Sequence, residues 1–475
     1  MNGVKLMASG PVEEPMSLVI PVMPAEMSLV IPVMPAESDA EIEGEEVRLR
    51  ISGGEMKGIT EAPHYIENEK DPVLKELRSL NPLSSWRCIY RVPKRLRQGN
   101  EKAYTPQVVS IGPLHHGEEP LKGMEEHKLR YLRSFLDRTG VSFCDYIQMI
   151  KNQEGRLRGF YAESVEFGSD EFVRIVLVDA AFVIELLLRY YDKKYGGEDD
   201  YIFNNPRMLW DVRPDLRLIE NQLPFFILQD LFRFFSSSSL SLLDISHKFF
   251  KGEIDSKGKE ENFKNISNGD VQHFVDLIRI LYGQLKSKTR ANITVTDTPN
   301  VTELHQAGVK FKEGKGSSLF DIKFSHGILE IPKLTVDDTT ELTLRNLLAF
   351  EQCHRREEDY LANYVFLMKR LVKTPEDVQL LVDKEIIDNW LGDTHKISTL
   401  LHDLGTGMMV DHHYYAPLCK ELKDYREKLW HGWMVILKQN YFNTPWASIS
   451  VVAAVILLIL TVIQTACSYK SVPLF

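Results

Sequence analysis

The residues with the most capacity for chemistry are three histidines that lie close to acidic side chains. His115 and His116 are adjacent and His127 follows, with glutamates at Glu118, Glu119, Glu125 and Glu126. Imidazole and carboxylate groups bind zinc, so a metal or catalytic site is one interpretation. Adjacent histidines followed by an eleven-residue gap match no zinc template, and no H-E-x-x-H motif occurs. We therefore favour roles in turns and helix caps for His115, His116 and His127, and we predict no metal and no cofactor.

A second candidate is Asp179, which lies within the apolar stretch Glu171–Tyr190. A buried carboxylate must receive hydrogen bonds, pair with a cation or take up a proton. We expect Asp179 to pair with an arginine or with amides at a helix end; a catalytic carboxylate is the alternative. In the same stretch, Glu185 and Arg189 are spaced for a local ion pair along a helix.

Other polar groups have similar alternatives. The sequence Glu220-Asn221-Gln222 could recognise a ligand, but we expect its side chains to satisfy backbone groups where two helices meet. One basic cluster could bind anionic lipid headgroups or a phosphorylated partner, or pair with the chain's own acids, which we favour. Its members are Arg87, Arg91, Lys94, Arg95 and Arg97.

Known catalytic motifs are missing from the sequence. There is no G-x-S-x-G elbow, no P-loop and no G-x-G-x-x-G fingerprint, so we predict that the chain is not an enzyme. The net charge is −10, of which residues 1–70 contribute −8. Because no domain is basic, nucleic-acid binding is not expected. The five cysteines are scattered, which favours reduced thiols in a reducing compartment.

Helices must position most of these groups. The segment 124–139 places Leu129, Leu132, Phe135 and Leu136 on one stripe, and Glu171–Tyr190 predicts a core helix. Thr374 followed by Pro375 predicts a helix start, with the helix continuing through Trp390. A further short helix should follow Asp393, carrying Ile397, Leu400, Leu401 and Leu404. Gln107–Ile111 reads as extended, and Ser318–Pro332 as a hairpin around Ser-His-Gly. The expected fold is mainly α, with minor β.

The two ends of the chain differ in composition from the body at 71–442. Residues 1–70 predict a disordered acidic tail, in which Met16–Glu26 (MSLVIPVMPAE) is repeated letter for letter at Met27–Glu37. The repeat could be a bivalent docking motif, although a duplication in an unstructured tail is the simpler interpretation. Polar composition predicts a mobile surface insertion at about 236–262.

The C-terminal region predicts a membrane span. Ala447–Cys467 holds 21 uncharged residues without proline, about 31 Å of helix against a bilayer core of about 30 Å. Tail 468–475 would follow this transmembrane helix, so the lipid bilayer is an expected partner. More lysines and arginines precede the run than follow it, which predicts a single-pass protein with its body in the cytosol. Sequons at Asn265, Asn292 and Asn300 argue for the opposite orientation, but chance explains them.

Several blocks of the body resemble the plant domain of unknown function 247. The first blocks are Ile89-Tyr90-Arg91-Val92-Pro93, Tyr104-Thr105-Pro106, Val109-Ser110-Ile111-Gly112-Pro113, His115-His116-Gly117 and Met124-Glu125-x-His127-Lys128-x-Arg130-Tyr131-Leu132. The later blocks are Glu220-Asn221-Gln222-Leu223-Pro224-Phe225-Phe226, Ala307-Gly308-Val309-x-Phe311, Leu344-Arg345-Asn346-Leu347, Phe350-Glu351-Gln352 and Pro445-Trp446. The resemblance covers residues 71–467 and implies a plant protein with a helical body, a C-terminal membrane helix and no established enzymatic activity.

The sequence therefore predicts a membrane-anchored plant protein that acts as an interaction, recognition or signalling scaffold. Its protein partner is not defined by any motif, and the organelle is open between plasma membrane and endoplasmic reticulum. The alternative is an enzyme whose site combines scattered carboxylates and histidines that converge only in the folded chain.

Overall fold

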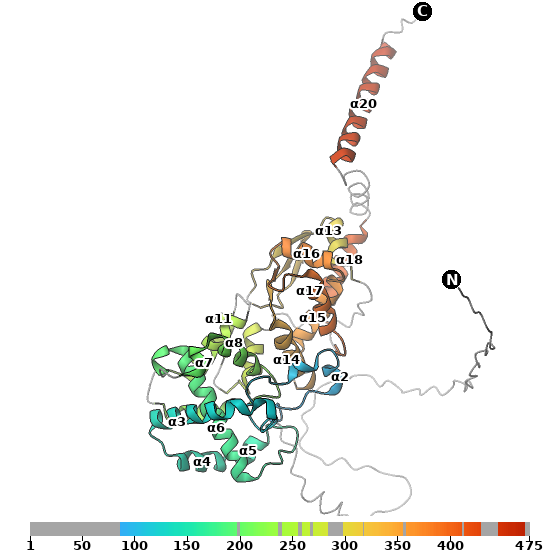
Figure 1. Cartoon of the computed structure of the whole chain (residues 1–475). Helices are drawn as coiled ribbons and strands as arrows, with labels where there is room; N and C mark the ends of the chain where they lie inside the picture. The colour runs from blue at the N-terminus through green and yellow to red at the C-terminus, as the bar shows by residue number, and fades with distance from the viewer. Residues whose placement is uncertain are drawn as a thin grey trace, which may run out of the picture. The chain divides into compact units, whose positions relative to one another are not determined.

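The computed structural model describes ten segments of the chain: residues 86–196, 200–235, 240–254, 259–266, 269–283, 298–316, 318–354, 358–410, 413–428 and 445–470. The predicted tail at 1–70 with its repeat and the sequon at Asn292 lie outside them. The described body is mainly helical with short strands, as the sequence predicts (Figure 1).

Helix α6 (Ser169–Tyr191) lies at the centre of the core, and most of its side chains between Phe172 and Arg189 are buried. Its apolar residues surround the helix, so burial on all sides stabilises it. The predicted core helix is confirmed. Helix α3 (Glu125–Thr139) packs along α6 and ends at Gly140, which has a left-handed backbone.

The predicted apolar stripe of α3 is wrong at one position. Leu132 and Phe135 are buried, but Leu129 is 55% exposed, and Lys128 is fully buried in its place. Lys128 lies four residues before Leu132 and seven before Phe135, which is the helical spacing of a single face. A charged residue thus occupies a core position that composition alone assigns to leucine.

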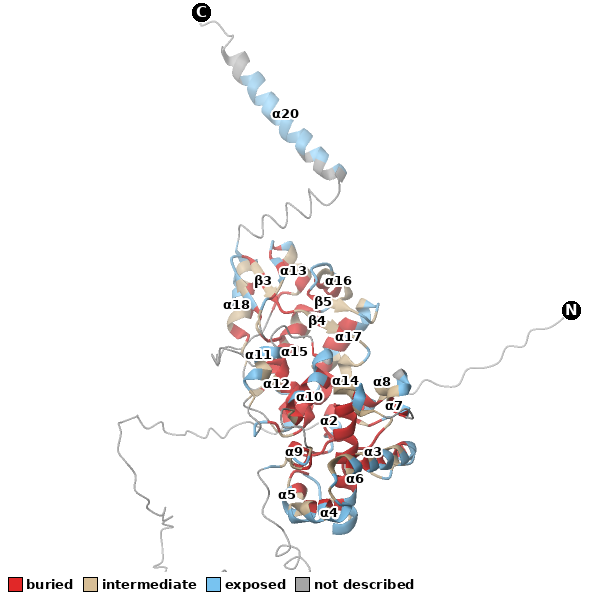
Figure 2. Ribbon diagram, turned by 90° about the vertical axis from the view of Figure 1, so that its left-hand side faces the viewer, coloured by how far each residue is buried: buried red, intermediate tan, exposed pale blue. Residues whose placement is uncertain are grey.

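The remaining helices surround α6 or continue the body above it in Figure 1. Figure 2 shows the buried residues following their inner faces. The first group comprises α2 (Lys94–Arg97), α4 (Phe143–Asn152), α5 (Glu154–Arg158), α7 (Tyr201–Asn204), α8 (Pro206–Asp215), α9 (Phe225–Phe232), α10 (Leu242–Phe250), α11 (Lys259–Lys264) and α12 (Phe274–Tyr282). The second comprises α13 (Val301–Gln306), α14 (Thr340–Cys353), α15 (Tyr360–Leu371), α16 (Pro375–Asp383), α17 (Thr394–Leu404) and α18 (Ala416–Glu427). Short 3-10 turns lie at Glu101–Tyr104, Glu119–Met124, Lys193–Tyr195 and Lys251–Glu253.

Helix α10 was not anticipated by the prediction of a surface insertion at 236–262. Ser241 and Asp244 form a capping box at its start, and Phe249 and Phe250 are buried in the core. Two parts of this range, 236–239 and 255–258, lie outside the described residues.

Within the described residues, five short strands form two small sheets. Strands β2 (Lys323–Ser325) and β3 (Ile328–Ile331) are antiparallel across His326 and Gly327, which confirms the predicted hairpin. Both turn residues have positive φ angles, the conformation that favours glycine. Strand β1 (Lys310–Glu313) adds to β3 in parallel.

The helix predicted to run from Thr374 to Trp390 is shorter than expected. Thr374 caps it with a capping box and Pro375 takes its first position, as predicted, but α16 ends at Asp383. Glu385 then has a left-handed φ of 59°, and strand β5 (Ile387–Asn389) pairs in parallel with β4 (Leu334–Val336). Ile386, just before this strand, and Ile387, its first residue, are β-branched and buried, so tertiary pairing overrides the helical pattern. Asp393 caps α17, as expected.

The segment Gln107–Ile111 is irregular. Its amides are bound by side chains, as described below, which is why it needs no strand partner. The same N-terminal region packs beside α14: the Tyr90 hydroxyl donates to the Ala349 carbonyl (2.9 Å), and the Asn346 amide donates to the Ala103 carbonyl (2.7 Å).

The C-terminal region forms helix α20 (Pro445–Lys470). In the part of the chain that the structure describes, no helix combines the length and apolar character needed to cross a bilayer. On this finding, the predicted transmembrane helix at Ala447–Cys467 is wrong.

Candidate functional site

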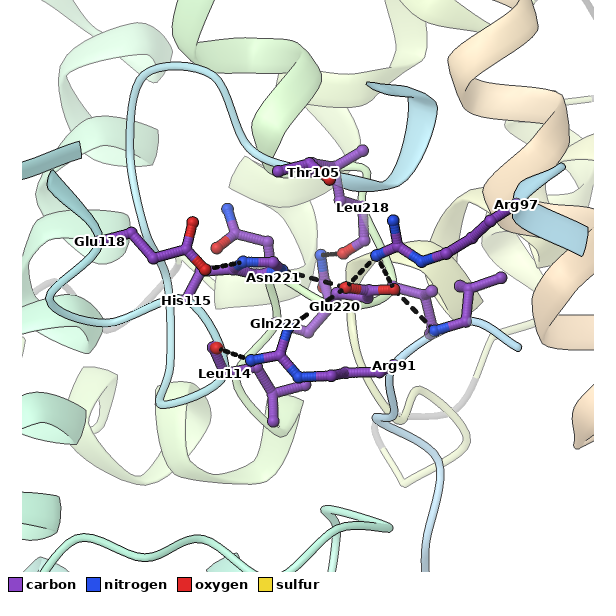
Figure 3. Close-up of polar contacts among 12 residues, drawn as sticks. Arg91, Arg97, Thr105, Leu114, His115, Glu118, Leu218, Glu220, Asn221 and Gln222 are labelled. Atoms are coloured by element: carbon purple, nitrogen blue, oxygen red, sulfur yellow. Dashed lines mark hydrogen bonds and ion pairs between the residues drawn. The ribbon is translucent and has the colours of Figure 1, made fainter. Parts of the chain in front are cut away.

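A cluster of buried polar side chains joins the N-terminal region to the turn between α8 and α9 (Figure 3). At its centre is Glu220, whose side chain is fully buried. We call Glu220, Arg97, His115 and Glu118 the Glu220 cluster. Nη2 of Arg97 lies 2.7 Å from both carboxylate oxygens of Glu220, and the backbone N–H of Val92 donates to Oε1 at 2.6 Å. The carboxylate is therefore held by a cation and a backbone amide.

His115 bridges two carboxylates in this cluster. Its Nε2 lies 3.1 Å from Oε2 of Glu220, and its Nδ1 lies 2.8 Å from Oε1 of Glu118. A neutral imidazole carries one N–H, so donation to both carboxylates requires the imidazolium form. Glu118 is the exposed end of this chain, with 41% of its side chain accessible.

Burial by itself raises the pKa of Glu220. The hydrogen bonds from His115 and Val92 and the charge of Arg97 outweigh burial, so the pKa lies below its ordinary value. Glu220 is thus an ionised, fully paired carboxylate.

The neighbouring residues Asn221 and Gln222 bind backbone groups. Asn221 accepts a hydrogen bond from the N–H of Ile111 (2.6 Å) and donates to the carbonyls of Val109 and Asp215. The Gln222 amide donates to the carbonyls of Leu216 and Leu218 and accepts from the N–H of Phe274. This is the role we predict for these side chains, at the junction of α8 and α9.

Asp215 completes the anchoring of the irregular segment at 107–111. Its carboxylate accepts hydrogen bonds from the backbone N–H groups of Gln107, Val108 and Val109 at 2.7–2.9 Å. Burial raises the pKa of Asp215 to about 6, and the three amides lower it only in part. Gly112 follows with φ of +78°, and a Cβ there would lie 2.6 Å from the Gln222 carbonyl oxygen, so only glycine fits.

Asp179 has a cation partner, but this partner is a lysine. Nζ of Lys128 lies 2.7 Å from Asp179 and 2.7 Å from Glu125, and the other Asp179 oxygen accepts from the N–H of Gly112 (2.8 Å). We call Lys128 and Asp179 the Lys128 pair. Burial alone lowers the pKa of Lys128, but the two carboxylates raise it overall, so the ammonium keeps its proton. Glu185 pairs with Arg189 (3.2 Å), as the spacing indicates, and also with Arg138 (2.9 Å).

The three histidines lie in separate environments. His115 belongs to the Glu220 cluster, His116 packs edge-on against Phe167, and His127 stacks on Tyr201 with ring centroids 4.5 Å apart. Among the described residues, no group of three histidine, cysteine or acidic side chains is arranged to hold a metal ion. Part of the basic cluster binds groups of the fold itself. Arg97 pairs with Glu220, Arg95 donates to the carbonyl of Gly407, and Arg91 donates to the carbonyl of Leu114.

A separate concave site lies where α5 and α9 meet, a region visible in Figure 2. We call this cavity of about 590 Å³ the aromatic groove; its lining includes Trp86, Arg156, Phe160, Phe226, Arg233 and Gln272. The guanidinium of Arg156 lies 3.8 Å from the ring centroid of Phe226 and 5.9 Å from that of Trp86. The volume falls in the range of ligand pockets.

Sequence reasoning missed the aromatic groove. Its residues come from the start of the body, from α5 and its C-terminal turn, from α9 and from the residues before α12, so no local pattern contains them. It also missed Lys128 as the partner of Asp179, although the spacing of Lys128 to Leu132 and Phe135 carried that signal.

Comparison with known proteins identifies the family. Residues 89–460 match DUF247, described as plant protein of unknown function. The chain belongs to the DUF247 family. UPF0481 protein At3g47200 of Arabidopsis thaliana is 30% identical over 439 residues, which cover 85% of this chain and 90% of that protein. A second UPF0481 protein from Arabidopsis thaliana, At3g02645, is 22% identical and covers 79% of this chain and 89% of its own length. No solved structure matches this chain.

Proposed function

We propose that this DUF247 protein is a recognition protein that binds a partner protein through the aromatic groove. The observation that carries this proposal is the state of Arg156. Its guanidinium lies on aromatic rings, and it has no carboxylate partner among the described residues. Tryptophan and arginine side chains in a concave site contribute strongly to protein–protein binding.

The neighbouring arginine is in a different state. Arg158, on the same short helix, donates to Glu154 (2.8 Å) and to the carbonyls of Val165 and Phe167. Arg158 therefore stabilises the fold, whereas the donors of Arg156 remain available to a ligand at the surface.

An enzyme is the second candidate function, and the contacts of His115 favour it. A histidine between two carboxylates, one of them exposed, is an arrangement found in general acid–base catalysis. However, the oxygens of Glu220 are bound by Arg97, Val92 and His115, so they have little capacity to accept a proton from a substrate. We therefore rank recognition above catalysis.

The proposal is tested by affinity capture of the full-length chain from plant cells, with quantitative mass spectrometry. The matched variants are Arg156→Gln in the groove and Arg207→Gln on α8. Arg207 is an exposed arginine that pairs with Asp211 at 3.0 Å. Partners that bind the groove should be lost from Arg156→Gln and kept by Arg207→Gln. Identical captured sets from wild type and Arg156→Gln would overturn the proposal.

We also propose that the body lies in the cytosol. Four of the five cysteines form no disulfide, which suits a reducing compartment; they are Cys88, Cys144, Cys353 and Cys419. Asn300 caps α13 and Thr302 donates to Asp377 (2.7 Å), so this sequon has a structural role in the fold. A glycosidase-sensitive mobility shift that disappears when Asn265, Asn292 and Asn300 are changed would place the body in the secretory lumen instead.

A further inference from the structure

The aromatic groove has three features that together define the chemistry of its ligand. The first is an aromatic surface: Trp86 is 52% exposed and stacks on Phe160 with ring centroids 6.1 Å apart and an interplanar angle of 18°. Phe160 in turn lies 5.3 Å from Phe226. A planar ring of a ligand can extend this series by packing against the exposed indole.

The second feature is excess positive charge. Arg233 is paired with Asp230 at 3.0 Å, and both line the groove together with Arg156. The groove therefore has one positive charge that is not neutralised, because no carboxylate in the described part of the chain pairs with Arg156. Stacked on Phe226, the guanidinium keeps its in-plane N–H donors, which match the geometry of a carboxylate.

The third feature is a buried acceptor. Oε1 of Gln272 is inaccessible to solvent and accepts no hydrogen bond from the described residues. The Gln272 backbone is held in place, since its N–H donates to Asp276 (3.1 Å) and its carbonyl accepts from Phe225 (2.7 Å). A buried acceptor without a donor costs free energy. Gln272 lines the groove, so a rotation of its side chain that turns Oε1 toward the groove would let a ligand N–H recover that free energy.

We propose that the aromatic groove binds a peptide segment of a partner protein in which an aromatic side chain is flanked by acidic residues. The aromatic ring packs on Trp86, a flanking carboxylate pairs with Arg156, and a backbone N–H of the segment donates to Gln272. A small aromatic acid and a basic segment fit these three features less well, because the first lacks a backbone amide and the second lacks the negative charge. This inference rests on the proposed function and specifies its partner.

The test is fluorescence anisotropy with labelled nonapeptides and the full-length protein. The peptides share glycine and serine flanks and differ only in the central three residues: Asp-Phe-Glu, Asp-Ala-Glu or Lys-Phe-Lys. The acidic aromatic peptide should bind about tenfold more tightly than the other two, since each loses one of the two strong contacts. Arg156→Gln and Gln272→Leu should each weaken its binding, whereas Arg207→Gln should leave it unchanged.

Each alternative outcome overturns the proposal in a distinguishable way. Equal affinity of the Asp-Phe-Glu and Asp-Ala-Glu peptides would show that the aromatic ring makes no contact in the groove. Unchanged binding by Arg156→Gln would show that no carboxylate of the peptide pairs with Arg156. If no peptide binds but partner capture still depends on Arg156, the peptide class is wrong and the proposed function stands. If capture is also independent of Arg156, both are wrong.

Discussion

The Glu220 cluster and the aromatic groove both contain an arginine, but the two arginines are used in opposite ways. Arg97 holds both oxygens of a fully buried carboxylate, and its side chain is 16% exposed. Arg156 is exposed, lies on aromatic rings and has no carboxylate partner in the described part of the chain. The comparison teaches that these ionic groups in the interior complete the structure, whereas Arg156 keeps its N–H donors available in a surface groove.

The largest effect should come from the Lys128 pair, which tests whether buried charges are structural. Asp179→Leu leaves the fully buried Lys128 with only the part-exposed Glu125 and the Ser110 hydroxyl, so the free energy of unfolding should fall by about 3–5 kcal/mol. The double variant Lys128→Leu/Asp179→Leu should recover part of this loss, because the buried ammonium is gone and Glu125, which loses its lysine, is 33% exposed. Chemical denaturation measures both. Unchanged melting temperatures for Asp179→Asn and Asp179→Leu would show that Asp179 is not a paired core residue.

Glu220→Gln should have the next largest effect. The amide keeps the shape of the carboxylate but removes the charge that Arg97, His115 and Val92 bind, at a cost of about 2–3 kcal/mol. Because the pKa of Glu220 lies below its unfolded value, the stabilisation is complete above that value and is lost only as pH falls through the folded pKa. Protonation of Glu220 should therefore leave the stability difference from wild type constant between pH 5.5 and 8, which is at least one unit above the unfolded pKa of about 4.3.

Glu351 sharpens the comparison, because it is a buried carboxylate held by two backbone amides, with no ion pair to a cation in the described part of the chain. It accepts from the N–H groups of Leu361 and Ala362, and burial raises its pKa to about 8. Because the pKa of Glu351 is higher in the folded protein, folding favours its protonated form. The protonated carboxyl contributes fully to the stability of the fold below the unfolded pKa of about 4.3, and this contribution is lost as pH rises through 8.

Glu351→Gln should remove this decline. Wild type should lose stability relative to Glu351→Gln as pH rises from 5 to 8 in urea denaturation. The same series on Glu220→Gln provides the control, since its difference should stay flat. A flat difference for both variants would contradict the assignment of a raised pKa to Glu351.

How much of this the sequence predicts depends on whether the pattern is local. The core helix α6, the caps at Thr374 and Asp393, the hairpin at His326-Gly327 and the backbone role of Asn221 and Gln222 all follow from short-range patterns, and the structure confirms them. The end of α16 does not, because strand β5 depends on pairing with β4, more than fifty residues earlier. The pairing within the Glu220 cluster could not be predicted for the same reason, because Arg97 and Glu220 are 123 residues apart in the sequence.

The smallest effect on stability should come from Arg156→Gln. An exposed cation over an aromatic ring contributes about 0.5–1 kcal/mol, so thermal unfolding should change little. Arg207→Gln is the surface control. If Arg156→Gln lowered the free energy of unfolding as much as Glu220→Gln does, Arg156 would also stabilise the fold. The contrast between the two sites would then not hold.

The most direct test of the central claim measures partner capture per folded molecule for Glu220→Gln and Arg156→Gln side by side. The account predicts that folded Glu220→Gln captures the same groove-dependent partners as wild type, despite its lower stability, because Glu220 lies in the interior. It predicts that Arg156→Gln loses those partners while it remains as stable as wild type within about 1 kcal/mol. Retention of all partners by Arg156→Gln, with their loss from folded Glu220→Gln, would contradict the account and move the functional site to the Glu220 cluster.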